Sequence, residues 1–480
     1  MKKAKLWMLA AALFCTASFT SCNDDDKNSG SPAEGLGGEN RQAFVTHTKA
    51  SLKKAAENLN FSSMNAANHI NQEFNTMVLN NPNFQRAIIP LFNKKVAESI
   101  QPVEPGSELY EKGYRAMATV DLTNFNYRFT MRDDDLGFDV EEANDFEMIL
   151  NGTSLDTKQP GKGIVKLTLK ASGAQYKHVM SSQRRPDMAI IAIIPSTFRF
   201  VISNKASNAW EELFEGTFVN EINQSSQSEY IDRNTDAFII SGTLTSNIKK
   251  LPNSGMLADA TTLTFTIKHD PVNQKGEMKF SFIHFDQMVL NAHAVMNDQD
   301  GIMDISQLSS NSSILDIFIA MMSGKSMEEG RLNLFDDLII DASITDCQKA
   351  LEVWNDMTTA RRNYADMNTI DNYVMQLNRL ITATMECWGV EQLIPMRLQT
   401  EKIGVDYWSV PALCFTDENL FVPITELLDK ESISYGINII DHAVEPTRQG
   451  IIVVRQFIQF IQTLMREIQN AGPFNENIDN

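Results

Sequence analysis

The stretch NFNYRFTM, residues 124–131, alternates apolar and polar side chains along its whole length. Phe125, Tyr127, Phe129 and Met131 occupy every second position, and polar residues fill the positions between them. Successive side chains of a β-strand point to opposite faces of a sheet, so this pattern predicts a strand with one apolar and one polar face. Such strands are typical of antiparallel sheets, which can pack on one face and meet water on the other.

The same period of two recurs between residues 112 and 296. Further examples are VKLTL at 165–169, LTFTI at 263–267 and MKFSF at 278–282. Turn-forming residues such as Pro160 and Gly161 separate these runs. We predict a long, curved antiparallel meander of about eight strands over this region.

Helical spacing dominates the segments on either side. Residues 40–100 predict two or three helices, interrupted at NNPN, residues 80–83. Helical patterns return between 312 and 390, notably at 314–322 and 347–388, and residues 450–469 carry a broad apolar stripe. Between 392 and 442 a second β block is predicted, with extended stretches at 393–400 and 408–415.

The first 22 residues, MKKAKLWMLAAALFCTASFTSC, have the layout of a secretory signal. Three lysines precede an uncharged apolar run from Leu6 to Phe19, which is short for a transmembrane helix of about 20 residues. Small Ser21 stands directly before Cys22, and the bulky Phe14 before Cys15 makes that cysteine a poor competitor. Of the two cysteines in this segment, Cys22 is therefore the one of interest.

At Ser21 and Cys22 the chain resembles the lipobox of bacterial lipoproteins, although Phe19 stands where Leu is usual. The resemblance implies attachment of diacylglycerol to the Cys22 thiol, cleavage before Cys22 and acylation of its new amino group. Two or three acyl chains anchor a protein stably without a spanning helix.

The acidic run after Cys22 resembles the export tag of surface lipoproteins of the Bacteroidota. Its acids, Asp24, Asp25 and Asp26, are the candidate tag residues. The resemblance implies an outer-membrane protein that is lipid-anchored and exposed at the cell surface. An inner-membrane retention signal and a simple solvated charge run are the alternatives.

These patterns predict an α+β fold in which a curved antiparallel sheet is packed by N-terminal, middle and C-terminal helices. The predicted segments are a lipoprotein signal peptide at 1–21, a flexible acidic tether at 22–38, an N-terminal helical segment at 39–105, an antiparallel sheet region at 106–299, a helical region at 300–390, a second β block with the C-terminal helix at 391–470, and a tail at 471–480.

The charge of the chain limits the classes of partner that it would bind, and its cysteine content limits the kinds of site. The chain holds 42 Lys and Arg against 61 Asp and Glu, a net charge of −19. Removal of the predicted signal deletes three lysines and no acid, which lowers the charge further. This balance disfavours nucleic acids and anionic headgroups as partners bound through charge. Beyond Cys22 only three widely spaced cysteines follow, predicted to be small buried residues: Cys347, Cys387 and Cys414.

No recognisable catalytic, cofactor or metal-binding motif was found. None of the seven histidines forms an HExxH pattern, and His284 is predicted to be a core or rim residue on the apolar face of its strand. The acidic stretch 132–147 is interpreted as a solvated connection. The stretch 297–304 resembles a calcium loop only in its middle and is interpreted as a turn.

The leading functional prediction is a lipid-anchored, non-enzymatic protein that binds a small molecule or a protein partner outside the cell. A first alternative is a hydrophobic-ligand or lipid carrier that uses the concave sheet, similar in general arrangement to the half-barrel lipid carriers found near bacterial outer membranes. A second is a hydrolase with an unrecognised pair of carboxylates. The first two differ in whether the apolar face of the sheet is filled or hollow.

Replacing the predicted lipidation site tests the anchor. Cys22→Ala removes the only thiol that the lipobox positions for acylation, so we expect loss of acyl labelling and release of the protein from membranes. Labelling with a clickable fatty acid, followed by membrane fractionation, measures both. Cys15→Ala is the control, and acyl labelling that persists in Cys22→Ala would contradict the prediction.

Overall fold

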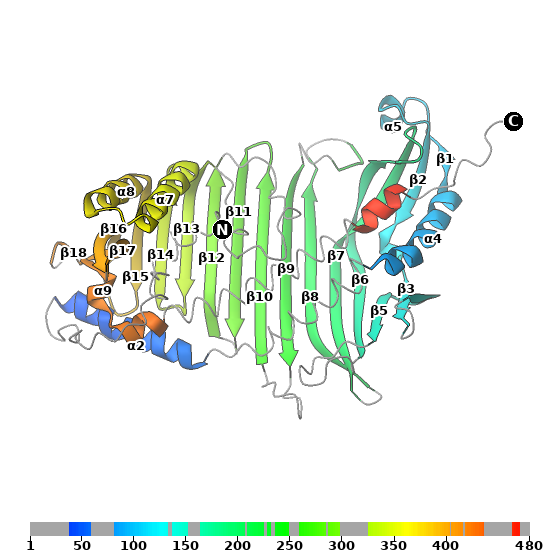
Figure 1. The fold of residues 1–480 in the computed structure, drawn as a ribbon. Coiled ribbons are helices and arrows are strands. Elements are labelled where there is room, and N and C mark those ends of the chain that lie inside the picture. The colour runs from blue at the N-terminus through cyan, green and yellow to red at the C-terminus, as the bar shows by residue number, and fades with distance from the viewer. Residues whose placement is uncertain are drawn as a thin grey trace. The chain divides into compact units, whose positions relative to one another are not determined.

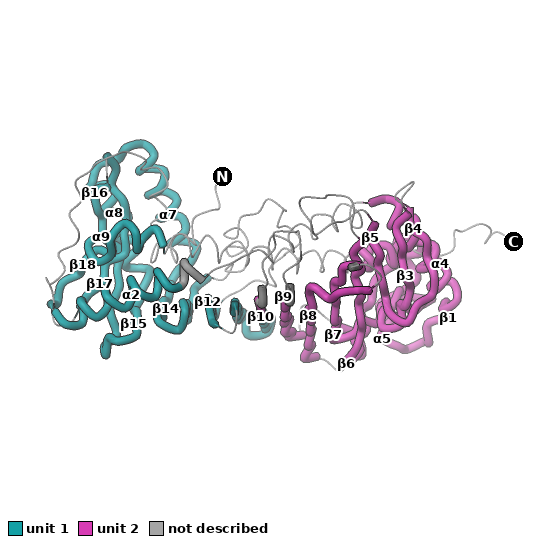
Figure 2. The backbone as a smooth tube through the Cα atoms, turned by 90° about the horizontal axis from the view of Figure 1, so that it is seen from below, with its two compact units in different colours: residues 1–61, 263–448 teal, residues 62–262, 449–480 magenta. Residues whose placement is uncertain are grey.

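The computed structural model describes residues 38–58, 81–132, 137–151, 164–206, 209–224, 228–231, 236–248, 259–284, 287–297, 325–403, 405–415, 418–435 and 463–470. The chain divides into two compact units, which Figure 2 distinguishes by colour. Unit 1 comprises residues 1–61 and 263–448, and unit 2 comprises residues 62–262 and 449–480. Antiparallel sheet dominates the structure and several helices accompany it, as the sequence predicts.

Unit 2 contains nine strands among its described residues, together with two α-helices, a 3₁₀ turn and a helical stretch at 463–470 (Figure 1). The strands are β1 Gln101–Pro102, β2 Ala116–Asp121, β3 Tyr127–Met131, β4 Phe138–Glu142, β5 Phe146–Asn151, β6 Ile164–Ser181, β7 Met188–Ala206, β8 Ala209–Asn223 and β9 Ala237–Ile248. The helices are α4 Pro82–Ser99, α5 Glu108–Glu111 and η3 Leu122–Asn124.

Strand β7 organises the sheet of unit 2. One of its edges pairs with β6, and its other edge pairs first with β2 and then with β8. The β2 and β7 strands run parallel, as do β3 and β5, so the prediction of a purely antiparallel meander is wrong here. The cause lies in the sequence MAIIAIIP at 188–195, whose first five residues are all buried. A continuous apolar run suits a strand covered on both faces, which is the usual setting of parallel pairing.

A cluster of phenylalanine rings joins α4 to the neighbouring strands. Asn81 caps the helix by accepting a hydrogen bond from the Asn83 N–H, and Pro82 follows at the first helical position, so the predicted break is the start of this helix. The ring centroids of Phe84 and Phe129 lie 5.4 Å apart, and those of Phe92 and Phe125 lie 5.0 Å apart.

Unit 1 contains the remaining strands and helices. The strands are β10 Asp259–Asp270, whose first residues still belong to unit 2, β11 Lys275–His284, β12 Gln287–Asn297, β13 Ser326–Leu334, β14 Leu338–Ile344, β15 Ile381–Cys387, β16 Ile394–Ile403, β17 Asp406–Phe415 and β18 Leu420–Pro423. The helices are α2 Glu39–Asn58, α7 Cys347–Arg362, α8 Met367–Leu380 and α9 Ile424–Leu427.

From β11 to β18 each strand pairs antiparallel with the next one in the chain, so this part is a meander, which was predicted only as far as residue 296. The predicted alternation is confirmed in β11, where Met278, Phe280 and Phe282 are buried and Phe282 is 0% exposed. His284 continues the same face and is also buried. These aromatic side chains therefore belong to a packed interior.

Two predictions of secondary structure are wrong in detail. The region 300–390, predicted to be helical, contains β13, β14 and β15 as well as α7 and α8. The sequence ITATMEC of β15 is rich in β-branched residues and buries every second side chain, which favours a strand over the predicted continuation of the helix. The region 112–296 holds eleven strands among its described residues, β2 to β12, rather than about eight. The predicted helix at 314–322 and residues 450–462 of the C-terminal one lie outside the described residues.

The helices of unit 1 lie at opposite ends of its strands, α2 at one end and α7 with α8 at the other (Figure 1). The Phe44 ring of α2 lies 5.8 Å from that of Phe415 in β17. Helices α7 and α8 form the connection between β14 and β15, and each begins at an aspartate cap, Asp346 and Asp366. This connection places α8 beside β16.

The phenylalanine cluster gives a stability prediction. Phe129 is 0% exposed and contacts the rings of both Phe84 and Phe146, so we expect Phe129→Ala to lower the free energy of unfolding by about 3 to 5 kcal/mol. Denaturant unfolding measures the change. Glu142→Ala, on an exposed position of β4, should change the free energy by less than about 0.5 kcal/mol, and equal effects of the two variants would contradict this packing.

Candidate functional site: a polar groove between α8 and β16

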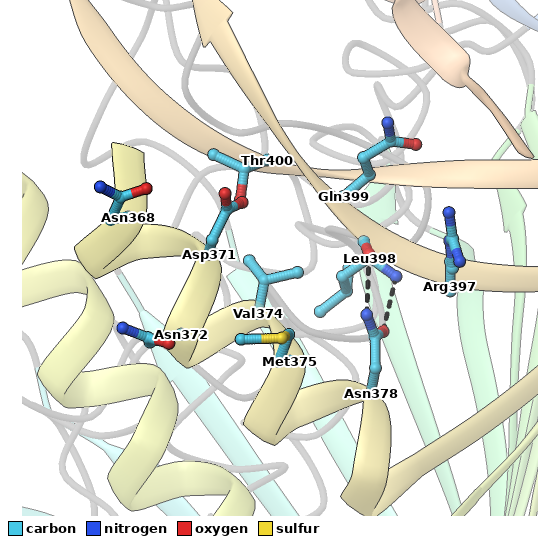
Figure 3. Close-up of a pocket in the computed structure, with 10 residues that line it drawn as sticks. All are labelled: Asn368, Asp371, Asn372, Val374, Met375, Asn378, Arg397, Leu398, Gln399 and Thr400. Carbon is cyan, nitrogen blue, oxygen red and sulfur yellow. Dashed lines mark hydrogen bonds between the residues drawn. The ribbon is translucent and has the colours of Figure 1, made fainter. Parts of the chain in front are cut away.

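An open groove of about 580 Å³ lies within unit 1, between α8 and β16 (Figure 3). Ligand pockets in proteins commonly enclose roughly 300 to 1,000 Å³. The described residues that line this groove are Asn368, Asp371, Asn372, Val374, Met375, Asn378, Arg397, Leu398, Gln399 and Thr400.

Apolar packing holds the helix against the strand. Helix α8 buries Ile370, Val374 and Leu377, which share one helical face because they lie three or four residues apart. On β16 the buried side chains alternate, and Leu398 and Thr400 belong to the buried set. The polar residues of α8 therefore remain along the rim of this contact, where they line the groove.

At Leu398 of β16 a side-chain amide forms the hydrogen bonds that a neighbouring strand would otherwise form. The carboxamide of Asn378 donates to the carbonyl of Leu398 and accepts from its N–H, and both hydrogen bonds are 2.8 Å long (Figure 3). Neighbouring β15 pairs with β16 only from the Met385–Ile394 pair to the Ala383–Met396 pair. Asn378 thus satisfies the next backbone groups of β16, which β15 does not reach.

Two further polar atoms in the groove wall have no hydrogen-bond partner among the described residues. The hydroxyl oxygen of Thr400 is buried, in a side chain that is 9% exposed, and the amide oxygen of Gln399 is buried as well. Buried polar groups are nearly always hydrogen-bonded in native proteins, and leaving one without a partner costs about 1 to 3 kcal/mol.

The chemistry of the lining is polar and nearly neutral. Four side chains end in amides, and the two charged side chains of the lining, Asp371 and Arg397, have opposite signs. Arg397 is held by stacking 3.9 Å from the ring centre of Phe421. Amides both donate and accept hydrogen bonds, so the groove suits an uncharged ligand rich in such groups. A two-carboxylate hydrolytic mechanism needs two acids, whereas the described lining contains one, Asp371.

The residues singled out from the sequence lie elsewhere. Cys22, Asp24, Asp25 and Asp26 fall outside the described residues, as do residues 298–304 of the calcium-like stretch. Among the described part of the acidic stretch 132–147, several acids form ion pairs across strands, for instance Glu141 and Glu147 with Arg128. Within the described ranges no three His, Cys, Asp or Glu side chains are grouped so that they could hold a metal ion.

Two of the three cysteines after Cys22 are small buried residues, as predicted, and the third is not. Cys347 and Cys387 are almost fully buried, and this desolvation raises the pKa of each thiol to about 11. Cys414 is partly exposed. Because nucleophilic chemistry needs the thiolate, the raised pKa makes Cys347 and Cys387 poor nucleophiles.

A ladder of charges crosses β10 to β13. Glu277 accepts hydrogen bonds from Lys268 and Lys279, each 2.7 Å long, and lies 3.1 Å from the Nε2 atom of His293, whose Nδ1 atom lies 3.1 Å from Glu329. Desolvation by itself would raise the pKa of Glu277, but the two lysines outweigh it and lower this pKa to about 2. Cross-strand charge pairs of this kind are ordinary on the solvated face of a sheet.

The sequence carried one overlooked signal for the groove. Helix α8 reads MNTIDNYVMQLNRL and contains three asparagines, a residue that is a weak helix former and usually occurs at caps and turns. Asn368, Asn372 and Asn378 are the three, and all line the groove. Such an excess inside a helix indicates side chains used for hydrogen bonding, but the partner strand follows only from the fold.

In comparisons with known proteins, no family model matches this chain, and no match was found among curated proteins or solved structures. Across the described helices, none combines the length and apolar character needed to cross a membrane.

The amide pair of Asn378 can be tested by adding a charge to it. In Asn378→Asp the Leu398 carbonyl loses its donor and faces a carboxylate at neutral pH, so we expect stability to fall by about 1 to 3 kcal/mol. Asn372→Asp adds the same charge at an exposed position of the same helix and should cost less than about 0.5 kcal/mol. Thermal unfolding of both variants measures the difference, and equal losses would show that the amide pair contributes nothing specific.

Proposed function

We propose that this protein is a lipid-anchored, extracytoplasmic binding protein whose groove between α8 and β16 holds an uncharged, polar ligand. The observation that carries the binding role is the groove itself, which four amide side chains line. The proposal includes no catalytic step.

The anchor rests on the sequence. The signal-like segment, Ser21 before Cys22 and the acidic run after it support attachment to the outer membrane with the folded units at the cell surface. In this proposal the acyl chains on Cys22 carry the membrane affinity. The polar residues between Cys22 and the start of α2 act as a tether, because they contain almost nothing apolar to bury.

The proposal also includes the predicted packing of N-terminal, middle and C-terminal helices on the sheet. It is supported by the ring contacts of α2 with β17 and of α4 with β3. Under this arrangement the apolar face is filled by the protein's own side chains. Phe280 and Phe282, which are 7% and 0% exposed, argue in the same direction and against a carrier that binds lipid on this face.

A groove-filling variant tests the binding role. Asn372 is exposed at the groove, so Asn372→Trp should fill it with an indole ring and leave the Asn378 pair with Leu398 in place. The protein is isolated from its own membranes in mild detergent, and the bound polar molecules are identified by mass spectrometry after denaturation.

We expect a molecule present in the wild type to fall at least about tenfold in Asn372→Trp, a loss of roughly 1.4 kcal/mol in binding. Glu98→Trp, at an exposed position of α4 in unit 2, is the control and should keep the molecule. Equal contents in all three proteins would contradict a binding role for the groove.

A further inference from the structure

The groove lies along an edge of β16 that pairs with no neighbouring strand among the described residues. Strand β16 pairs with β17 from Met396 to Ile403, but with β15 only as far as Met396. The part of β16 from Leu398 to Ile403, on the side where β15 would lie, is called here the open edge. At about 3.3 Å per residue it is roughly 17 Å long.

The direction of the backbone groups along the open edge follows from the pairing. Leu398 is opposite Pro411 of β17, which has no N–H to donate, and the N–H and carbonyl of Leu398 point to Asn378 instead. In an antiparallel strand, residues two positions apart direct their backbone groups to the same side. The N–H and carbonyl of Thr400, and those of Lys402 after it, therefore face the same side as the Asn378 pair.

Asn378 shows what kind of group this edge binds. Its carboxamide has the same donor and acceptor as a peptide group and forms both hydrogen bonds with Leu398 at 2.8 Å. Among the described residues, no side chain forms such a pair at the next position along the edge, Thr400. A second amide, placed one dipeptide further along, would repeat the pair that Asn378 makes.

We infer that the occupant of the groove is an extended peptide segment of a partner protein, added to the open edge of β16 as a short strand. Strand addition of this kind derives affinity from main-chain hydrogen bonds and specificity from alternate side chains. This inference rests on the proposed function and names its ligand class.

The walls of the groove fit such a strand. Alternate side chains of the peptide would point to α8, where the half-exposed Met375 offers apolar contact and Asp371 offers a charge. Methionine adapts its shape to different apolar partners. Because the lining carries one acid and one base, Asp371 and Arg397, a peptide without net charge is favoured.

The probe is a library of random linear heptapeptides displayed on phage and selected on the purified mature protein, with Asn372→Trp used to remove peptides that bind elsewhere. Selected peptides are synthesised with a single N-methyl group at each position in turn. N-methylation removes one backbone donor and leaves the side chains unchanged, so it separates main-chain pairing from side-chain contact.

We expect N-methylation at alternate positions to weaken binding by about tenfold or more, and at the positions between them by less than about threefold. Thr400→Pro, which removes the N–H of the open edge at a place where a strand tolerates proline, should weaken binding about tenfold. Thr400→Val keeps that N–H and should retain affinity within about threefold.

Two outcomes would overturn the inference, and the second is measured on the wild-type protein alone, so it does not depend on the folding of a variant. One is a library that yields no peptide that binds the wild type and fails to bind Asn372→Trp. The other is a peptide whose affinity ignores N-methylation at every position. If mass spectrometry then finds a glycan or another ligand without peptide groups that is lost in Asn372→Trp, the proposed function stands and only the peptide assignment fails.

Discussion

Every backbone N–H and carbonyl that is removed from water needs a hydrogen-bond partner, and this constraint governs both units. In unit 2 it explains why β7 pairs along one edge with β6 and along the other with β2 and β8 in succession. In unit 1 it explains the meander from β11 to β18, where each strand finds its partner in the next segment of the chain. Between β14 and β15 the chain departs into α7 and α8. At β16 the side-chain amide of Asn378, from α8, satisfies the backbone groups of one residue.

How much of the fold was readable from the sequence depends on how many faces of a strand are buried. A strand with one buried face alternates, and for that reason MKFSF was predicted correctly, as was NFNYRFTM from Tyr127 onward; its first residues belong to a 3₁₀ turn and the link after it. The start of β7 is buried on both faces and does not alternate, so its parallel pairing with β2 was missed. In β15 the signal was present in ITATMEC, but the strong helical pattern before it was extended too far.

The groove could not be predicted, because it depends on residues that only the fold brings together. Asn378 and Leu398 are separated by 20 residues and belong to a helix and a strand. The pattern of α8 predicted an amphipathic helix and said nothing about which strand it would meet. The open edge exists because β15 pairs with β16 only as far as Met396, which is a property of the topology. The three asparagines of α8 were the available hint, since asparagine inside a helix is generally used for its amide.

Hydrogen exchange of the β16 amides, resolved to single residues by electron-transfer fragmentation, tests most directly whether the edge of β16 is open. In the protein without ligand, the Leu398 N–H should be protected by Asn378. The N–H groups of Thr400 and Lys402 should exchange at least about tenfold faster, a difference of roughly 1.4 kcal/mol in the cost of opening. Protection of Thr400 equal to that of Leu398 would mean that the chain itself already pairs with this edge, and would contradict the account of the groove as a binding site.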